Sequence, residues 1–132
     1  MSEQDVKHRI LVVDDEPSVR EFVERALHHF GYEVIAASDG NSALEILAKE
    51  PAFDVVLTDI VMPDLDGVSL ALKIARDFPN TKIMMMSGYV QQRQRAYNLE
   101  KLVEDVLSKP FSIEDLCERV DKVVKGERKE AS

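Results

Sequence analysis

Cysteine is nearly absent from this chain, and long apolar runs are absent altogether. Cys117 is the single cysteine among 132 residues, so it has no partner in the chain for a disulfide. No cluster of cysteines and histidines offers a structural zinc site. Residues 1–9 lack the apolar stretch of a signal peptide, and no run approaches the ~20 apolar residues of a membrane span. These absences predict a soluble protein of the cytoplasm.

Positive charge is also in deficit. Lys and Arg number 17 against 25 Asp and Glu, which leaves a formal net charge of -8. This balance argues against a nucleic acid or an anionic membrane as the main partner, because both attract basic patches. Hydrophobic residues make up 45% of the chain, which is enough for a real core, and 132 residues fit one domain. We expect that domain at residues 9–125, with a tail at 1–8 and a charged tail at 126–132.

Short apolar runs alternate with helical patterns from one end of the chain to the other. The runs are nearly continuous, which is typical of parallel strands that are buried on both faces. This order predicts an α/β fold, a doubly wound five-stranded parallel sheet with helices on both faces. The expected strands are 10–13, 32–37, 55–57, 82–86 and 103–107. The expected helices are 17–30, a short one around 43–47, one from about 67 to 78, a weak one within 89–102, and 113–124, with Ile113 on the apolar face of the last.

Acidic residues end two of the expected strands. Asp14 and Asp15 follow the first run, and Asp59 follows the third. Ligands of an open α/β sheet bind beyond the carboxyl ends of the strands, where Ser87 and Lys109 are also expected. If the first and third strands are neighbours, the three carboxylates repel one another until a proton or a cation intervenes. Oxygen ligands suit Mg²⁺, and an acidic pocket with a metal, a lysine and a hydroxyl suits phosphoryl transfer.

Four short motifs stand at these strand ends: residues 11–15 (LVVDD), 59–67 (DIVMPDLDG), 87–88 (SG) and 109–110 (KP). With them, residues 9–125 resemble the receiver domain of bacterial two-component response regulators. The resemblance implies a flavodoxin-like sheet of strand order 2-1-3-4-5. It also implies that Asp59 accepts a phosphoryl group from a sensor histidine kinase or a histidine phosphotransfer protein. Such a chain catalyses its own phosphorylation and dephosphorylation and is no enzyme toward other substrates.

The same resemblance implies how the metal is held. Mg²⁺ is expected among Asp14, Asp15 and Asp59, with Asp15 as a direct ligand and Asp14 acting largely through water. The backbone carbonyl of Val61 is expected to complete the protein ligands.

The resemblance also implies roles for residues at the other strand ends, and the chain departs from the family pattern at one position. By the resemblance, Lys109 contacts the phosphoryl oxygens, Ser87 hydrogen-bonds the phosphate and reports its presence, and the Lys109–Pro110 peptide bond is cis. Receivers usually carry an aromatic residue three positions before this lysine, where the present chain has Val106. Tyr89 is therefore the expected aromatic switch, in the loop after the fourth strand.

Other functions remain in competition at this point. A flavodoxin-like cofactor binder would need a Ser/Thr/Gly-rich phosphate loop after the first strand, where the chain has the acidic segment 14–17. A hydrolase with an aspartyl-phosphate intermediate usually carries an Asp-x-Asp motif on the first strand and a cap domain. A degenerate receiver that binds partners without phosphate would ordinarily have lost an acid, the lysine or the acceptor, and none is missing.

The remaining expectations concern partners and structural residues. We expect a stand-alone receiver whose downstream protein partner binds the face formed by the fourth helix, the fifth strand and the last helix. Asp66 is an expected helix N-cap and Asp39 an expected turn residue. The other residues considered are Arg93, Arg95, Tyr97 and Asn98 on the partner face, Met84, Met85 and Met86 in the core, His28 and His29 in solvent, and Cys117 as an inert half-buried residue.

Overall fold

A computed structural model describes residues 7–88 and 102–126. Within these ranges the strands are β1 (Arg9–Val13), β2 (Glu33–Ala37), β3 (Val55–Asp59), β4 (Lys82–Ser87) and β5 (Asp105–Ser108). The helices are α1 (Pro17–His29), α2 (Gly40–Lys49), α3 (Gly67–Asp77) and α5 (Ile113–Val124). The weak helix expected within 89–102 lies outside the described residues, and so do Tyr89, Arg93, Arg95, Tyr97 and Asn98.

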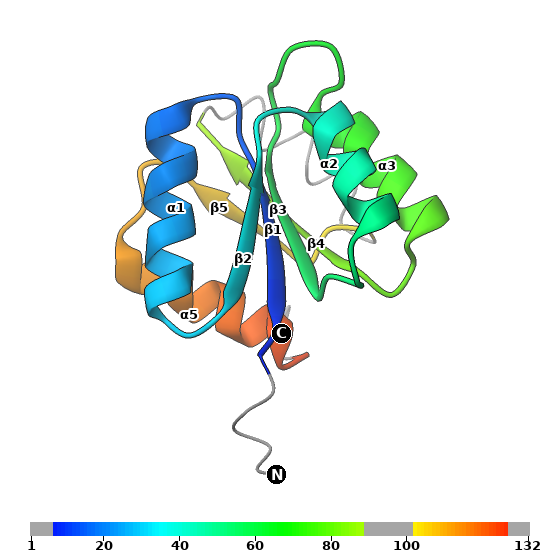
Figure 1. The fold of residues 1–132 in the computed structure, drawn as a ribbon. Helices are drawn as coiled ribbons and strands as arrows, with labels where there is room; N and C mark the ends of the chain where they lie inside the picture. Colours follow the sequence, from blue (N-terminus) through cyan, green and yellow to red (C-terminus); the bar gives the residue numbers. More distant parts are fainter. Residues whose placement is uncertain (1–6, 89–101, 127–132) are drawn as a thin grey trace, which may run out of the picture.

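The strands form one parallel sheet in the order β2-β1-β3-β4-β5, which confirms the predicted fold class. Helices α1 and α5 lie on one side of it and α2 and α3 on the other (Figure 1). Alternate strand residues face opposite sides, so there are two cores. One joins Leu57 of β3 to α1 and α5, and the other joins Val56 to α2 and α3. The neighbouring pair β1 and β3 forms the centre of the sheet.

Local sequence signals explain where the helices begin and end. Pro17 occupies the first turn of α1, where its missing N–H is not needed, and Gly31 beyond the helix end has a φ of 110°, a conformation that favours glycine. Asp66 accepts a hydrogen bond from the backbone N–H of Ser69 at 2.8 Å and so caps α3, as predicted. Asp39 does the same for α2, which is a more specific role than the turn residue we expected.

Two expectations at the edge of the fold are wrong. The fifth strand covers Asp105–Ser108 rather than 103–107, because Val103 packs into the core beside α2 and α3 before the strand begins. Ile113 shares the helical spacing of the apolar face of α5, yet it is 50% exposed. It stands in the first turn of the helix and lines a surface groove with Phe22 of α1 instead of reaching the sheet.

The other expectations for structural residues agree with the structure, except at Cys117. Met84, Met85 and Met86 are fully buried in the sheet, and His28 and His29 are exposed at the end of α1. Cys117 is more buried than expected, at 3% exposure, and burial raises the pKa of its thiol, as does the nearby Glu114. None of the described helices combines the length and the apolar character that crossing a membrane requires.

Candidate functional site

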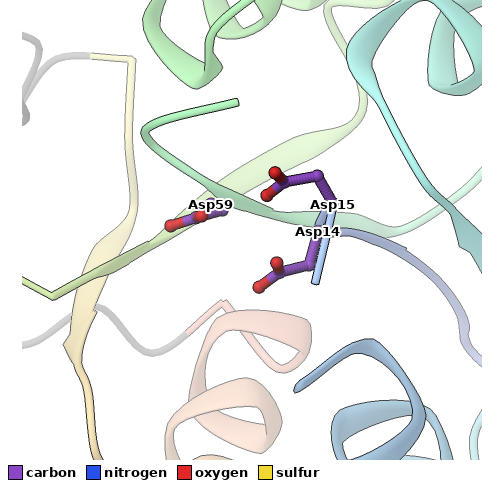
Figure 2. A group of neighbouring side chains, drawn as sticks. All are labelled: Asp14, Asp15 and Asp59. Atoms are coloured by element: carbon purple, nitrogen blue, oxygen red, sulfur yellow. The ribbon is translucent and has the colours of Figure 1, made fainter. Parts of the chain in front are cut away.

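The carboxyl ends of the two central strands bring three acids together. Asp14 and Asp15 directly follow β1, and Asp59 is the last residue of the adjacent strand β3. Each of the three offers a carboxylate oxygen, and these atoms all lie within 4.8 Å of one another. Figure 2 shows the three side chains projecting in the same general direction from neighbouring strand ends. The convergence predicted from the sequence is therefore present.

Asp14 is the most enclosed member of this acidic cluster, with no exposed surface. One carboxylate oxygen accepts a hydrogen bond from the backbone N–H of Glu16 at 2.9 Å, and the other accepts one from Lys109 Nζ at 3.2 Å. Arg20 of α1 donates to the backbone carbonyl of Asp14 at 2.8 Å. These contacts fix both the side chain and the main chain of Asp14, whereas Asp15 is exposed.

Lys109 connects β5 to the acidic cluster. Its Nζ lies 3.2 Å from a carboxylate oxygen of Asp14 and 3.3 Å from one of Asp59. Its backbone N–H donates to the carbonyl of Ser87 at 2.8 Å, which ties it to the end of β4. The Lys109–Pro110 bond is cis, as expected. Ser87 is 2% exposed at the end of β4, beside this lysine.

The electrostatics of the site are unbalanced. Burial is the main influence on Asp59 and raises its pKa, Lys109 opposes this, and Asp14 adds to it, so the net shift is upward. For Lys109, burial lowers the pKa, but the attraction of Asp59 and Asp14 outweighs it and keeps the ammonium charged. Lys109 is the only ion-pair partner that the described part of the chain gives to this cluster of three carboxylates. The cluster therefore still favours a further cation, and its oxygen ligands could hold a hard divalent metal.

A pocket of about 570 Å³ opens beside the acidic cluster. Asp59 and Lys109 line it together with Glu16, and Val61, expected to contribute a carbonyl, is 48% exposed at its rim. The remaining wall is largely apolar and is formed by Val19, Phe22, Gly88, Pro110 and Phe111. A charged reactant can thus reach Asp59 from solvent, with an apolar surface next to it.

Two residues that contact the site were not predicted from the sequence. Arg20 holds the main chain of Asp14, and its only signal was a basic residue one turn into the helix that follows the acids. Gly67 lies against the backbone of Asp59, which no spacing rule reveals. Val106 is partly buried against the core of α2 and α3, so an aliphatic side chain occupies the place of the usual aromatic.

Comparison with known proteins agrees with this geometry. Residues 10–121 match the family described as the response regulator receiver domain. The chain is 38% identical to the response regulator receiver protein CpdR of Brucella abortus, over 88% of this chain and 96% of that protein. It is 35% identical to the transcriptional activator protein PfeR of Pseudomonas aeruginosa, covering 91% of this chain but 39% of PfeR.

A solved structure adds a chemical parallel. The response regulator protein TrrA of Thermotoga maritima, in complex with Mg²⁺ and BeF, superposes with a TM-score of 0.79 and 33% identity. The match covers 88% of this chain and 98% of TrrA.

Proposed function

This chain belongs to the response regulator receiver domain family and is a phosphoacceptor signalling protein of a two-component system, and we propose that Asp59 is its acceptor residue. The observation that supports this choice is the placement of Asp59. It is the one acid of the cluster that lines the pocket and also contacts Lys109. Asp14 is enclosed by its own hydrogen bonds, and Asp15 does not line the pocket.

The donor set fits Mg²⁺. Asp14, Asp15 and Asp59 offer hard oxygen ligands beside the pocket, and the backbone carbonyl of Val61 is the proposed fourth protein ligand. A bound Mg²⁺ would neutralise charge on the phosphoryl oxygens. The structure of TrrA with Mg²⁺ and BeF supports this assignment.

Each residue of the site has its own role in the proposed phosphoryl transfer. A carboxylate oxygen of Asp59 forms the new bond to phosphorus, and the bond from phosphorus to the donor's histidine nitrogen breaks, so that the imidazole leaves. Lys109 places a positive charge beside that oxygen, where the incoming phosphoryl oxygens arrive. Ser87 is the proposed hydroxyl that hydrogen-bonds the transferred group. On this proposal the chain catalyses only its own phosphorylation and dephosphorylation.

Receiver domains interact with histidine kinases or phosphotransfer proteins, and the pocket suggests where such a donor rests. The donor has to cover the pocket to bring its phosphohistidine to Asp59. The apolar rim of Phe22 and Phe111, whose rings lie 6.2 Å apart, would then be buried beneath it. We propose a separate face for the downstream partner, which includes β5 and α5; the expected fourth helix of that face lies outside the described residues. Tyr89, which also lies outside them, remains the proposed aromatic switch.

Phosphorylation by a small-molecule donor tests the assignment. Incubation with Mg²⁺ and acetyl phosphate should increase the intact mass by one phosphoryl group, and chelation with EDTA should prevent it. Asp59→Asn should abolish the increase while the far-ultraviolet circular dichroism stays unchanged. The matched control is Asp77→Asn, an exposed acid at the end of α3 that pairs with Arg76, and it should react like the wild type. Uptake by Asp59→Asn at the wild-type rate would refute the assignment.

A further inference from the structure

The first residue of α3 lies against the backbone of the proposed phosphoacceptor. A Cβ on Gly67 would stand 2.2 Å from the carbonyl oxygen of Asp59 and 2.9 Å from Cα of Ile60. Real Cβ atoms do not approach backbone atoms that closely, so any larger residue at this position has to push the end of β3 and the start of α3 apart. The N–H of Gly67 also donates to the carbonyl of Ile60 at 2.7 Å. The helix start and the strand end are therefore in direct main-chain contact.

A buried hydroxyl contacts the same peptide group from within β3. Thr58 has no exposed surface, and its Oγ1 donates to the carbonyl of Asp59 at 3.0 Å. The N–H of this same peptide group, which is that of Ile60, donates to the carbonyl of Met86 at 3.2 Å and to Asp59 Oδ1 at 3.0 Å. The Asp59–Ile60 peptide is thus held on its carbonyl side by Thr58 and Gly67, and on its N–H side by β4.

This arrangement leaves the peptide little freedom to rotate. A rotation would swing the Asp59 carboxylate relative to Asp14 and Lys109, and it would move the adjoining backbone toward Val61. Reactions between oriented groups are sensitive to such shifts, since a misplacement of ~1 Å can reduce a rate by about 100-fold.

We propose that Thr58 and Gly67 are positioning residues that fix the Asp59–Ile60 peptide, and through it the orientation of the acceptor carboxylate. The inference rests on the proposed function of Asp59 and names two residues that set its geometry without touching the phosphoryl group. Thr58 acts through its hydroxyl, and Gly67 acts through the absence of a side chain.

Thr58→Val removes the hydroxyl and keeps the shape of a buried β-branched residue. Loss of one hydrogen bond to the peptide should weaken Mg²⁺ binding on the order of fivefold. Acetyl phosphate should react more slowly even at saturating Mg²⁺, and the Ile60 amide resonance should shift in the metal-free protein. Thr58→Ser retains the hydroxyl and should recover most of the affinity. Binding is measured by calorimetric titration of Mg²⁺ into the full chain.

The chain offers a matched control in a second buried threonine. Thr81, at 9% exposure, donates its hydroxyl to the carbonyl of Phe53 at 2.9 Å, just before β4 begins and away from the acidic cluster. Thr81→Val loses an equivalent side-chain-to-backbone hydrogen bond and should keep wild-type Mg²⁺ affinity. If Thr58→Val also keeps that affinity, or if both variants lose it equally, the inference is wrong.

Gly67→Ala is the more severe variant. At a temperature well below its unfolding transition, its Mg²⁺ affinity should fall by about tenfold or more, because a Cβ displaces the Asp59 carbonyl. Ile74→Ala, a fully buried residue of the same helix, lowers stability without reaching the strand end and should bind Mg²⁺ normally. Should Gly67→Ala not fold, the threonine variants decide alone. If the wild type itself binds no Mg²⁺ and takes up no phosphate, the proposed function fails instead.

Discussion

At the amino ends of β1 and β2, the guanidinium of Arg9 faces two carboxylates, Glu33 and Glu50, whose side chains are about half exposed to water. At the carboxyl ends of β1 and β3, the ammonium of Lys109 is the one cation that the described contacts give to a cluster of three carboxylates, and two of the three are buried. The two ends belong to the same sheet. They differ in how deeply the carboxylates are buried and in how many of them share one cation.

Arg9 organises the amino end. Its guanidinium lies 3.1 Å from Glu33 and 3.1 Å from Glu50, donates to the carbonyl of Pro51, and stacks over the ring of Phe53 at 4.4 Å from the centroid. Its side chain is only 13% exposed, so these contacts are partly shielded from water. This end stabilises the folded chain without any added ion.

At the carboxyl end, by contrast, the charges oppose folding. Asp14 and Asp59 are buried beside each other and Asp15 is close by, so the folded state brings like charges together that the unfolded chain keeps apart. Stability at this end therefore depends on what binds there. The comparison indicates that one end maintains the fold and the other is kept incomplete for its ligands.

Lys109→Ala should produce the largest change of stability. Without the ammonium, Asp14 and Asp59 lose their common ion-pair partner, and breaking a buried pair in this way destabilises by about 3 kcal/mol. Urea denaturation in EDTA measures the loss, and saturating Mg²⁺ should recover part of it, because the ion binds the folded state.

Lys122→Ala is the control for a lost positive charge. Lys122 is an exposed residue of α5 whose Nζ lies 3.8 Å from Glu118, so its removal should cost less than about 0.5 kcal/mol. A similar, Mg²⁺-insensitive loss in both variants would show that the carboxyl end is not ion-dependent.

Arg9→Ala should destabilise somewhat less than Lys109→Ala, by about 2 kcal/mol, because several hydrogen bonds and the ring contact disappear together. In contrast to the lysine variant, Mg²⁺ should change its stability no more than it changes that of the wild type. Arg9→Lys, which keeps the charge but not the planar donor group, should lie between Arg9→Ala and the wild type. Weaker Mg²⁺ binding in Arg9→Ala would mean that the two ends are coupled.

Removing one carboxylate charge at each end of the sheet should change the stability of the folded chain slightly, with opposite signs at the two ends. Burial of Asp59 and the nearby Asp14 raise its pKa, with Lys109 opposing, so its ionised form is less favourable in the folded state than in the unfolded chain. For Asp121 at the amino end, burial raises the pKa, but hydrogen bonds from Lys125 and Tyr32 outweigh it, and the net shift is downward. In EDTA at pH 7, Asp59→Asn should therefore be more stable than the wild type, and Asp121→Asn less stable by under about 1 kcal/mol.

The pH dependence of stability distinguishes the contribution of Asp59 from that of Asp121. The folded chain holds the Asp59 proton to higher pH than the unfolded chain, so stability is lost as pH rises from about 4 through the raised pKa. The gain from Asp59→Asn should accordingly shrink as pH falls through that window. The stability that Asp121 contributes is present above about pH 4 and is lost as pH falls through its lowered pKa. Denaturation curves at about pH 7, 5 and 3 test both, and a common sign would contradict the comparison.

The sequence was sufficient to predict the strands of the sheet and the residues of the acidic cluster. Continuous apolar runs and strand-ending acids follow simple rules of burial and topology, so residue order alone placed Asp14, Asp15 and Asp59 at one edge of the sheet. That β1 and β3 are neighbours followed from the strand order that the family resemblance implies. The boundary of β5 was misjudged because Val103 is buried outside the sheet, and burial does not distinguish a strand from the segment before it.

The positioning contacts could not be predicted in the same way. Gly67 is an ordinary glycine at a helix start until the distance to the Asp59 carbonyl is known, and Thr58 lies just beyond the expected strand 55–57, although the structure includes it in β3. The Gly67 contact depends on how closely α3 approaches the end of β3, and the Thr58 contact depends on where its hydroxyl points, and no periodicity encodes either. Ile113 was misplaced for a related reason, since helical spacing assigns a face but not how far along the helix that face stays covered.

Strand β3 and the residue after it alternate between the two cores, with Leu57 in the layer of α1 and α5 and Ile60 in that of α2 and α3. Asp59 comes immediately before the residue that enters the second layer, and its main chain meets both Gly67 and β4. A phosphoryl group added to this side chain would therefore act first on the start of α3 and on the end of β4, the two elements that its main chain touches.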